Sequence, residues 1–483
     1  MNEENRVLSI RQNLISRLVE VRLEQGISQA ELARRVGTQR SNICRFESGQ
    51  QNVTMDFYIR VANALGQDIS FIWEQRKLQP QLSLRQFYEG MVSDCSKDTG
   101  TVSRYSLRLF DEELLSFSLQ HRGMEGLRAE ILRVNEAKRQ LLPLDLEVSG
   151  TGMVKWLRRR IIPKNRAFVD EILKSLGLGI YDTKGIIDVC LGLSLNDSYW
   201  VVPEEFAGSF AEYNLYENRF SEALALVAYT GAGYSNQAFS TSPELTTHGM
   251  LRKAWRYIEA DGIYLYKGGT EGGANTGCEP YSEFYACQVA ETMGLNAVHY
   301  DLENWKGILA SKCRLFTSPS VSFVPAGQLI HSGGIGGCLD YYDSLGEQFG
   351  QQLRSMLVFD AVIYNEDRHF GNFGLLRDNH TGKLIGPAPI FDNGLSLFNY
   401  AMKDDFSELA AYAVTRSNPY GVSYEEICRR VCGAKQRAQL RRLIGFRFQR
   451  HPDPERNLPE WRLSAIEKQI QWRVRQLLAM PWG

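Results

Sequence analysis

The stretch Ile363-Tyr-Asn-Glu-Asp-Arg-His-Phe-Gly-Asn-Phe-Gly374, followed by Pro389-Ile-Phe-Asp-Asn-Gly394, decides how this chain is interpreted. It places Asp367 five residues before Asn372 and sets a second acid, Asp392, after an apolar Ile-Phe pair. Phosphoryl transfer uses one carboxylate to orient the acceptor hydroxyl, and an amide and a second carboxylate to hold Mg²⁺ on nucleotide phosphates. The spacing matches the catalytic loop of protein kinases, although His369 follows the Asp instead of preceding it. The two segments therefore predict a phosphoryl-transfer site.

A lysine and a glutamate stand upstream where such a site needs them. Lys267 ends a strand-like run that begins at Gly262, and a glycine-rich loop follows it. The sequence from Glu279 to Met293 predicts a helix that Gly294 stops. Kinases fix a strand lysine against the nucleotide phosphates by pairing it with a glutamate on the next helix, so we expect Lys267 to pair with Glu283. The alternative is that both are unrelated solvent-exposed side chains.

Several of these motifs together resemble those of one family, the HipA-like serine/threonine kinases, which are the toxin halves of bacterial toxin–antitoxin systems. The matching segments, within roughly residues 195 to 400, are Tyr264-Leu-Tyr-Lys267, Tyr281-Ser-Glu283-Phe, Asn365-Glu-Asp-Arg-His-Phe-Gly-Asn372-Phe-Gly and Ala388-Pro-Ile-Phe-Asp392. The resemblance implies that Lys267 binds the ATP phosphates and that Glu283 is its partner. It also implies that Asp367 is the catalytic base and that Asn372 and Asp392 are Mg²⁺ ligands.

The expected nucleotide loop departs from the family pattern. Better-known members carry Ser-Gly-Val-Gln, whereas this chain has Ser242-Pro-Glu-Leu-Thr246-Thr247-His248-Gly249-Met-Leu-Arg-Lys253. We expect Gly249 to allow close backbone approach to ATP, and Thr246 and Thr247 to supply hydroxyls. Because an autophosphorylated serine of this loop switches the family's kinases off, Thr246 or Thr247 is a candidate for that modification. The alternative is that these threonines cap a helix beginning near Gly249.

The N-terminal segment carries an independent pattern of short helices. Ser28-Gln-Ala-Glu31 is a capping box that starts a helix through Arg35, which Gly37 ends. A second helix opens at Thr38 and closes at Gly49, and a third runs from Thr54 to Leu65 with Gly66 as its stop. The expected inward-facing side chains are Leu14, Ile15, Leu18, Val21, Leu32, Val36, Ile43 and Phe46. Two short helices joined by a tight glycine-containing turn predict a helix-turn-helix module.

This segment resembles the Xre/Cro repressor family over about residues 9 to 72. The resemblance implies DNA contacts from Gln29, to backbone phosphate, and from the second helix, where Gln39, Arg40, Ser41 and Arg45 are the candidates. We assign Glu47 to a structural ion pair. Residues 32–46 carry four arginines and no acid, which gives a basic face to an otherwise neutral module. Use of the module for protein contacts alone is the alternative. Operators of such modules are usually palindromic, so a homodimer is expected.

Two other basic segments are open to two interpretations each. Six basic residues between Lys155 and Arg166 suit either nucleic acid or a solvated helix face and contacts with the kinase lobe, and we favour the second. Seven arginines and one lysine without an acid lie between Arg429 and Arg450. They suit either a docking surface for an acidic or RNA-bound substrate or helices with basic outer faces, and again we favour the second.

The remaining patterns carry little chemistry. We expect a strand near residues 105–110, a helical run around residues 128–141, and a flexible connection at Gly333–Gly337 before a helix from Leu345 to Tyr364. His248, His299 and His331 lack metal-ligand spacing, and His369 is expected to brace the backbone near Asp367. Asp360 could anchor the catalytic loop or form a local ion pair.

Composition limits the class of protein. The chain has 483 residues, a formal net charge of −1, 43% hydrophobic residues and nine cysteines without a Cys-x-x-Cys pair. No signal-like or membrane-spanning apolar stretch is present, so we expect a cytoplasmic protein with free thiols and no membrane contact. A chain of this length exceeds what one core usually holds.

The expected fold is multidomain, with an all-α helix-turn-helix head followed by an α+β, two-lobed kinase-like part. The predicted division is 1–78 for the head, 79–193 for an intermediate α/β segment, and 194–483 for the kinase, with lobes at 194–330 and 331–483. The expected function is an ATP- and Mg²⁺-dependent serine/threonine protein kinase with a protein substrate of unknown identity, joined to an autorepressor that binds a double-stranded DNA operator. The alternatives are a repressor with a silent, nucleotide-sensing kinase fold and a small-molecule kinase.

Overall fold

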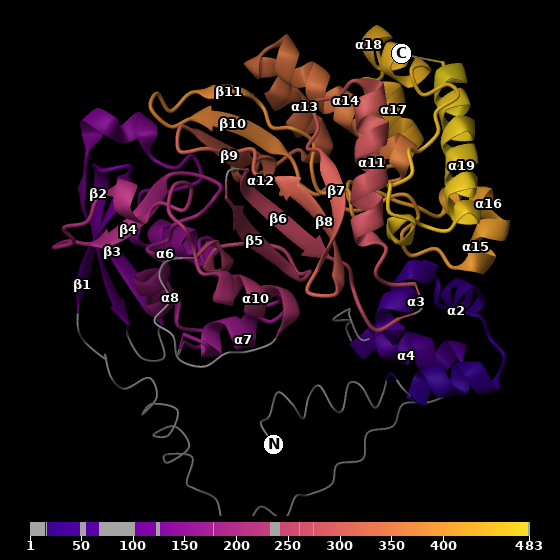
Figure 1. The fold of residues 1–483 in the computed structure, drawn as a ribbon, viewed down its shortest axis with the longest axis horizontal. Coiled ribbons are helices and arrows are strands. Elements are labelled where there is room, and N and C mark those ends of the chain that lie inside the picture. Colours follow the sequence, from indigo (N-terminus) through magenta and orange to yellow (C-terminus); the bar gives the residue numbers. More distant parts are fainter. Residues whose placement is uncertain are drawn as a thin grey trace, which may run out of the picture. The chain divides into compact units, whose positions relative to one another are not determined.

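The computed structural model describes residues 15, 17–48, 55–66, 102–121, 126–176, 178–231, 242–259, 261–273 and 275–481. These residues divide into two compact units. The described helices between residues 15 and 66 form the first unit, and nearly all the described residues from 102 onward form the second (Figure 1). The first is all-α and the second is α+β, as the sequence predicted.

The first unit is built from short helices around a small apolar core. After a helix over residues 17–24 come α2 (Gln29–Val36), α3 (Arg40–Glu47) and α4 (Met55–Ala64). The Ser28 hydroxyl accepts a hydrogen bond from the backbone N of Glu31 at 3.1 Å and so begins α2, and Gly37 ends it in the left-handed region at φ +70°. The cap of α3 is Gln39, one residue later than predicted.

The predicted inward face of this unit is confirmed. Its buried core is Ile15, Leu18, Val21, Ile27, Leu32, Ala33, Val36, Ile43, Phe46, Phe57, Tyr58, Val61, Ala62 and Leu65. The expected helix boundaries at Gly49 and Thr54, and the side chain of Leu14, lie outside the described residues.

The second unit opens with an antiparallel sheet of order β3-β2-β1-β4. Its strands are β1 (Ser103–Leu109), β2 (Glu112–His121), β3 (Leu127–Val134) and β4 (Tyr199–Pro203). The prediction of a helix over 128–141 is wrong, because Leu127, Ala129 and Ile131 alternate with charged residues at the two-residue period of a strand. Only residues Glu136–Leu141 are helical there, as a 3₁₀ turn. Because β4 pairs with β1, this sheet extends across residue 193, where the sequence suggested a domain boundary.

Helices pack on this first sheet and enclose an apolar core. They are α6 (Gly150–Arg159), α7 (Val169–Lys174) and α8 (Thr183–Cys190), with α9 (Phe210–Tyr213) and α10 (Glu222–Thr230) following β4. Two of the six basic residues of this region, Arg160 and Arg166, form ion pairs within the second unit. Arg160 pairs with Asp197 at 2.8 Å, and Arg166, which is buried, pairs with the buried Glu244 just before β5. The favoured interpretation, contacts within the kinase-like part, holds for these two arginines.

Two further sheets and one helix form the centre of the second unit (Figure 1). The four-stranded sheet has the order β5-β6-β8-β7, with β5 (Lys253–Ile258), β6 (Gly262–Gly268), β7 (Tyr300–Trp305) and β8 (Ile308–Arg314). Helix α11 (Glu279–Met293) packs against β7 and β8 and ends at Gly294, as predicted. The three-stranded sheet contains β9 (Val321–Pro325), β10 (Gly374–Asp378) and β11 (Leu384–Pro387).

The rest of the unit is helical and surrounds α14 (Glu347–Ile363), whose last eight residues are all buried. The other helices are α12 (Ala326–Leu329), α13 (Gly334–Leu345), α15 (Lys403–Ser407), α16 (Leu409–Val414), α17 (Tyr424–Val431), α18 (Ala434–Arg441) and α19 (Glu460–Ala479). The predicted flexible connection at Gly333–Gly337 is wrong, since Gly334 already begins α13. Within the described ranges, no helix combines the length and apolarity needed to cross a membrane.

Several arginines of this helical part pair with nearby side chains or backbone carbonyls. Arg447 and Arg450 both pair with the buried Glu467 of α19, and Arg442 donates to the carbonyl of Met293. These arginines therefore serve helix packing, in line with the favoured interpretation of the basic segment. Eight cysteines are described, all free and six of them buried.

Candidate active site

Three elements converge on the amino group of Lys267. Lys267 lies near the end of β6, Glu283 on α11, and Asp392 beyond β11. The Nζ atom of Lys267 lies 2.9 Å from Oε1 of Glu283 and 2.6 Å from Oδ1 of Asp392. The predicted pairing of Lys267 with Glu283 is therefore present. The structure also brings Asp392 to the same amine.

The electrostatics of the cluster follow from burial and from these charges. Only 11% of the Lys267 side chain and 2% of the Glu283 side chain are exposed, against 38% for Asp392. Burial disfavours the charge on Lys267, but Asp392 and Glu283 outweigh it and hold the lysine pKa well above its usual range. Burial would likewise raise the pKa of Asp392, yet Lys267 and Lys253 hold it below its usual range. An ionised, half-exposed carboxylate is thus available to a cation.

The backbone around Asp392 is fixed by the same groups. Asp392 has φ 58°, a left-handed conformation that is costly for a residue with a side chain. Its N–H donates to the Tyr300 hydroxyl at 3.2 Å, and the next N–H, of Asn393, donates to Oε2 of Glu283 at 2.7 Å. Glu283 therefore holds Lys267 with one oxygen and the Asp392 segment with the other.

The predicted catalytic loop holds Asn372 close to Asp367 through a backbone hydrogen bond. The N–H of Asp367 donates to Oδ1 of Asn365 at 3.0 Å, and Nδ2 of Asn372 donates to the carbonyl of Asp367 at 2.9 Å. This bond leaves the amide oxygen of Asn372 as its cation-binding atom. Together with the Asp392 carboxylate it offers the oxygen donors that Mg²⁺ prefers. As predicted, His369 braces the loop, because its Nδ1 accepts from the N–H of Gly371 at 3.0 Å.

Arg368 joins two segments of the site, a role that the sequence analysis did not predict. Its side chain is fully buried and pairs with the buried Asp360 of α14 at 3.0 Å. It also donates to the carbonyl of Asn372 at 3.0 Å, to the carbonyl of Phe391 and to Oδ1 of Asn393. Arg368 thereby ties the catalytic loop to the segment that carries Asp392. The signal in the sequence was Asp360, whose role as an anchor of this loop is confirmed.

The nucleotide loop is a second anchored segment. Arg166 donates to the carbonyls of Glu244 at 2.6 Å and Lys253 at 2.9 Å, and both side chains of the Arg166–Glu244 pair are fully buried. The Thr247 hydroxyl donates to the carbonyl of Pro243 at 2.6 Å, and Thr246 is buried. No helix begins near Gly249, so the capping alternative is wrong. Whether either threonine contacts ATP or is phosphorylated stays a prediction.

Lys253 is the second residue that sequence reasoning did not single out. It lies opposite Lys267 in the register of β5 and β6, and its Nζ donates to the carbonyl of His248 at 2.8 Å. Gly249 has φ +96°, and a Cβ atom there would lie 2.1 Å from this Nζ. Burial lowers the pKa of Lys253 to about 7, with Lys267 as the next cause. Because burial and Lys267 disfavour its charge, an anion bound beside Lys253 would favour its protonation.

The predicted DNA-facing residues lie on α2 and in the first and last turns of α3. Gln29 donates to Glu47 at 2.9 Å, and Glu47 pairs with Arg22 at 2.6 Å, which confirms Glu47 as a structural ion-pair member. Arg34 and Arg35 both pair with Glu31, which reduces the expected basic face. In α3, Gln39 is the cap, Arg40 the first residue and Arg45 part of the last turn, while Ser41 is buried. Their DNA contacts stay predictions.

Comparisons with known proteins bear on both units. Residues 18–72 match the helix-turn-helix family model. A search of curated proteins gave no match to the chain. Among solved structures, the chain is similar to one from the Shewanella oneidensis toxin–antitoxin complex of HipA, HipB and operator DNA (TM-score 0.45, 13% identity, covering 78% of this chain and 100% of that one). It is also similar to the proinflammatory kinase CtkA of Helicobacter pylori (TM-score 0.37, 16% identity, covering 47% and 92%).

The kinase-like chemistry of the second unit rests on the side chains of this chain alone. The family model covers the segment whose capping residues predicted two short helices and a tight turn. The chain therefore carries a helix-turn-helix domain at residues 18–72, followed by a separate α+β unit.

Proposed function

We propose that the α+β unit is an ATP- and Mg²⁺-dependent kinase that transfers the γ-phosphoryl group to a serine or threonine of a protein. The observation that carries this proposal is the position of Lys267, with its amine 2.9 Å from Glu283 and 2.6 Å from Asp392. A strand lysine, a helix glutamate and a metal-binding acid meet at one point in kinases, because phosphoryl transfer depends on positioning and charge neutralisation.

Each residue has one task in this proposal. Lys267 binds the nucleotide phosphates, and Glu283 holds Lys267 in place. Asn372 and Asp392 would hold Mg²⁺, which would neutralise charge on the phosphates. Asp367 accepts the proton of the attacking hydroxyl, which orients that oxygen toward the γ-phosphorus. Lys253 adds a further positive charge beside Lys267 once phosphates raise its protonation.

The acceptor is the least constrained part of the proposal. The assignment of a protein serine or threonine follows the motif resemblance of the catalytic loop. A small-molecule acceptor would use the same six residues, so the assay includes both kinds of acceptor.

We further propose that the helix-turn-helix domain binds double-stranded operator DNA as a homodimer and represses the chain's own operon. Arg40 and Arg45 of α3 have the side chains that pair with guanine in the major groove. A kinase joined to such a domain would combine toxin-like and antitoxin-like roles in one chain.

The kinase proposal is tested by incubating the full chain with Mg²⁺ and γ-labelled ATP, with and without a cell extract. Label should appear on the chain or on extract proteins with wild type, and should be lost with Asp367→Ala. Label found only in small metabolites would establish the small-molecule alternative. No transfer to any acceptor would refute the enzyme and leave the silent, nucleotide-sensing fold.

The DNA proposal is tested by footprinting the upstream region of its own gene. Arg40→Ala and Arg45→Ala should each weaken protection by roughly 1–3 kcal/mol, the range for a bidentate base contact. Arg60→Ala, which changes an arginine of α4 instead, is the matched control. Protection that both α3 variants leave unchanged would rule out base reading by α3.

A further inference from the structure

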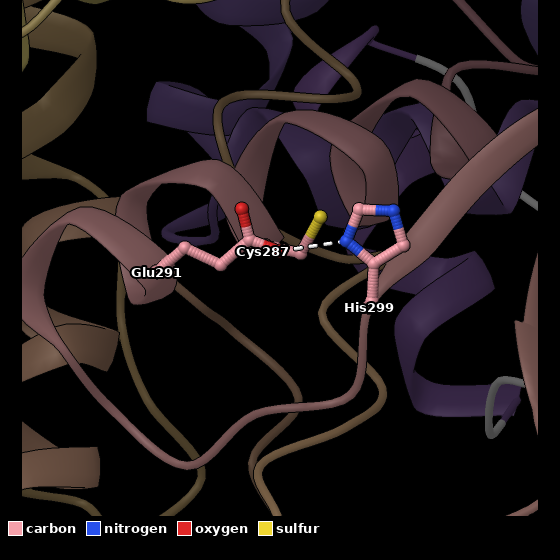
Figure 2. Close-up of side chains that lie close together, drawn as sticks. All are labelled: Cys287, Glu291 and His299. Atoms are coloured by element: carbon pink, nitrogen blue, oxygen red, sulfur yellow. Dashed lines mark hydrogen bonds and ion pairs between the residues drawn. The ribbon is translucent and has the colours of Figure 1, made fainter.

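A cysteine, a glutamate and a histidine outside the proposed active site come together at α11. Cys287 and Glu291 are four residues apart on this helix and therefore share one face. His299 comes from the segment between α11 and β7, and Figure 2 shows its imidazole beside the two helix side chains. One ligand atom from each of the three lies within 4.8 Å of the other two. Sequence spacing alone had set His299 aside as a ligand.

The three donors differ in exposure in a way that suits a bound ion. Cys287 is buried, with 1% of its surface exposed, and its thiol donates to the carbonyl of Phe284 at 3.1 Å. The side chains of His299 and Glu291 are 72% and 50% exposed, and Nδ1 of His299 lies 2.6 Å from Oε1 of Glu291. The ligand atoms of His299 and Glu291 are therefore open to solvent, and the buried sulfur of Cys287 lies beside them.

The chemistry of the donors selects the class of ion. Thiolate, imidazole and carboxylate are the usual ligands of Zn²⁺ and similar borderline transition ions, whereas Mg²⁺ and Ca²⁺ prefer oxygen alone. In a tetrahedral zinc site, ligands about 2.0–2.3 Å from the metal stand about 3.3–3.8 Å apart. Nδ1 of His299 and Oε1 of Glu291, now 2.6 Å apart, would have to separate to reach this range on binding. Three protein ligands leave a fourth position for water or another group.

The same three residues are connected to the proposed active site. Glu283, the partner of Lys267, lies one helical turn before Cys287 on the same face of α11. Tyr300 follows His299 directly, and its hydroxyl accepts from the N–H of Asp392 at 3.2 Å. Val298 donates to the carbonyl of Ile390 at 2.8 Å, two residues before Asp392. An ion that joins α11 to His299 would therefore fix the helix and the segment that position Glu283 and Asp392.

We propose that Cys287, Glu291 and His299 form a binding site for a Zn²⁺-like transition ion that holds α11 in the position where Glu283 pairs with Lys267. On binding, the Cys287 thiol releases its proton to solvent as the sulfur–metal bond forms, and no group changes oxidation state. The binding step stands independently of the kinase activity. The effect on α11 rests on the function proposed above.

The binding step is tested with Co²⁺ as a spectroscopic probe on the metal-free full chain, followed by competition with Zn²⁺. We expect one equivalent of Co²⁺ to produce a thiolate-to-cobalt charge-transfer band that Cys287→Ser abolishes. Loss of an outer-shell partner alone costs about 10–100-fold in affinity, so His299→Ala and Glu291→Gln should each weaken binding at least about tenfold. Cys338→Ser, another buried cysteine, and His331→Ala, another exposed histidine, are matched controls.

Absence of a band in wild type, or a band that persists in Cys287→Ser, would overturn the site. Equal binding by wild type, His299→Ala and Glu291→Gln would overturn it as well, because these exposed changes should not disturb folding. An independent readout is the melting temperature. Zn²⁺ should raise it in wild type by mass action and leave it unchanged in His299→Ala.

The coupling to α11 is tested by the affinity for ATP with and without one equivalent of Zn²⁺. We expect tighter ATP binding with the ion in wild type and no dependence in His299→Ala. An unchanged ATP affinity in wild type, in a sample that shows the cobalt band, would overturn the coupling. If ATP does not bind at all, the proposed function fails. The cobalt charge-transfer band then still shows whether the metal site exists.

Discussion

The predicted catalytic loop and the predicted nucleotide loop are each held by a buried arginine–carboxylate pair, but they differ in the charges that lie beside that pair. Arg368 and Asp360 hold the catalytic loop, and Arg166 and Glu244 hold the loop before β5. Around Arg368 the charges are matched and the backbone carbonyls of Asn372 and Phe391 are satisfied. The nucleotide loop instead ends at Lys253, a buried amine opposite a second lysine. The charges of the first loop are paired within the chain, whereas we propose that the second loop gains its counter-charge from the nucleotide phosphates.

The largest expected effect comes from breaking the catalytic anchor. Arg368→Met should lower the free energy of unfolding by about 3–5 kcal/mol, because it leaves Asp360 buried without its charge partner. Urea denaturation of the second unit's transition measures this change. Arg354→Met, which removes a partly exposed pair with Asp343, is the control and should cost about 1 kcal/mol or less. Equal losses in the two variants would contradict the structural role of Arg368.

The next effect is a pH dependence of stability that comes from the buried amine of Lys253 in the predicted nucleotide loop. The pKa of Lys253 is about 7 in the folded chain, against about 10.4 for an unfolded lysine. Between these values the unfolded chain binds a proton that the folded chain lacks, so stability gains from rising pH. The free energy of unfolding of wild type, relative to that of Lys253→Met, should therefore rise by up to about 1.4 kcal/mol per pH unit above pH 7. A difference in unfolding free energy that stays flat from pH 6 to 9 would show that Lys253 titrates normally.

A smaller effect is expected at Gly249. Gly249→Ala places a methyl group 2.1 Å from the Lys253 amine at a backbone φ of +96°. We expect a loss of about 1–2 kcal/mol in unfolding free energy, because L-residues disfavour positive φ. We also expect weaker ATP binding, since Lys253 must move. Gly336→Ala on α13, where a Cβ atom meets open space, is the matched control and should be neutral or stabilising. Unchanged ATP affinity in Gly249→Ala would mean that the Gly249 turn lies outside the nucleotide site.

The sequence predicted the parts of this molecule that depend on local patterns. The helix from Glu279 to Met293 was marked by Pro280 and Gly294, and α2 by Ser28 and Gly37. The pairing of Lys267 with Glu283 followed from the order of strand, loop and helix. By contrast, β3 was assigned to a helix because Leu132 and Arg133, which are both exposed, interrupt its two-residue period. Helix α13 was missed because glycines at its first turn suggested a loop.

Long-range partners were beyond such patterns. Nothing local to Arg368 indicates that it reaches Asn393, and nothing local to Lys253 indicates burial beside Lys267. The approach of His299 to Cys287 and Glu291 likewise depends on how the segment after α11 returns to β7. These contacts arise from the packing of elements that are distant in the chain, which residue spacing does not determine.

The central claim is that Lys267, Glu283 and Asp392 form a site for the phosphates of Mg²⁺-ATP. Its most direct test is titration calorimetry of Mg²⁺-ATP with wild type, Lys267→Met and Asp392→Asn, and with Arg354→Met as a control remote from this cluster. We predict that Lys267→Met weakens binding at least about tenfold, or 1.4 kcal/mol, and that Asp392→Asn removes its dependence on Mg²⁺. Wild-type affinity in both variants, each shown to be folded, would contradict the account.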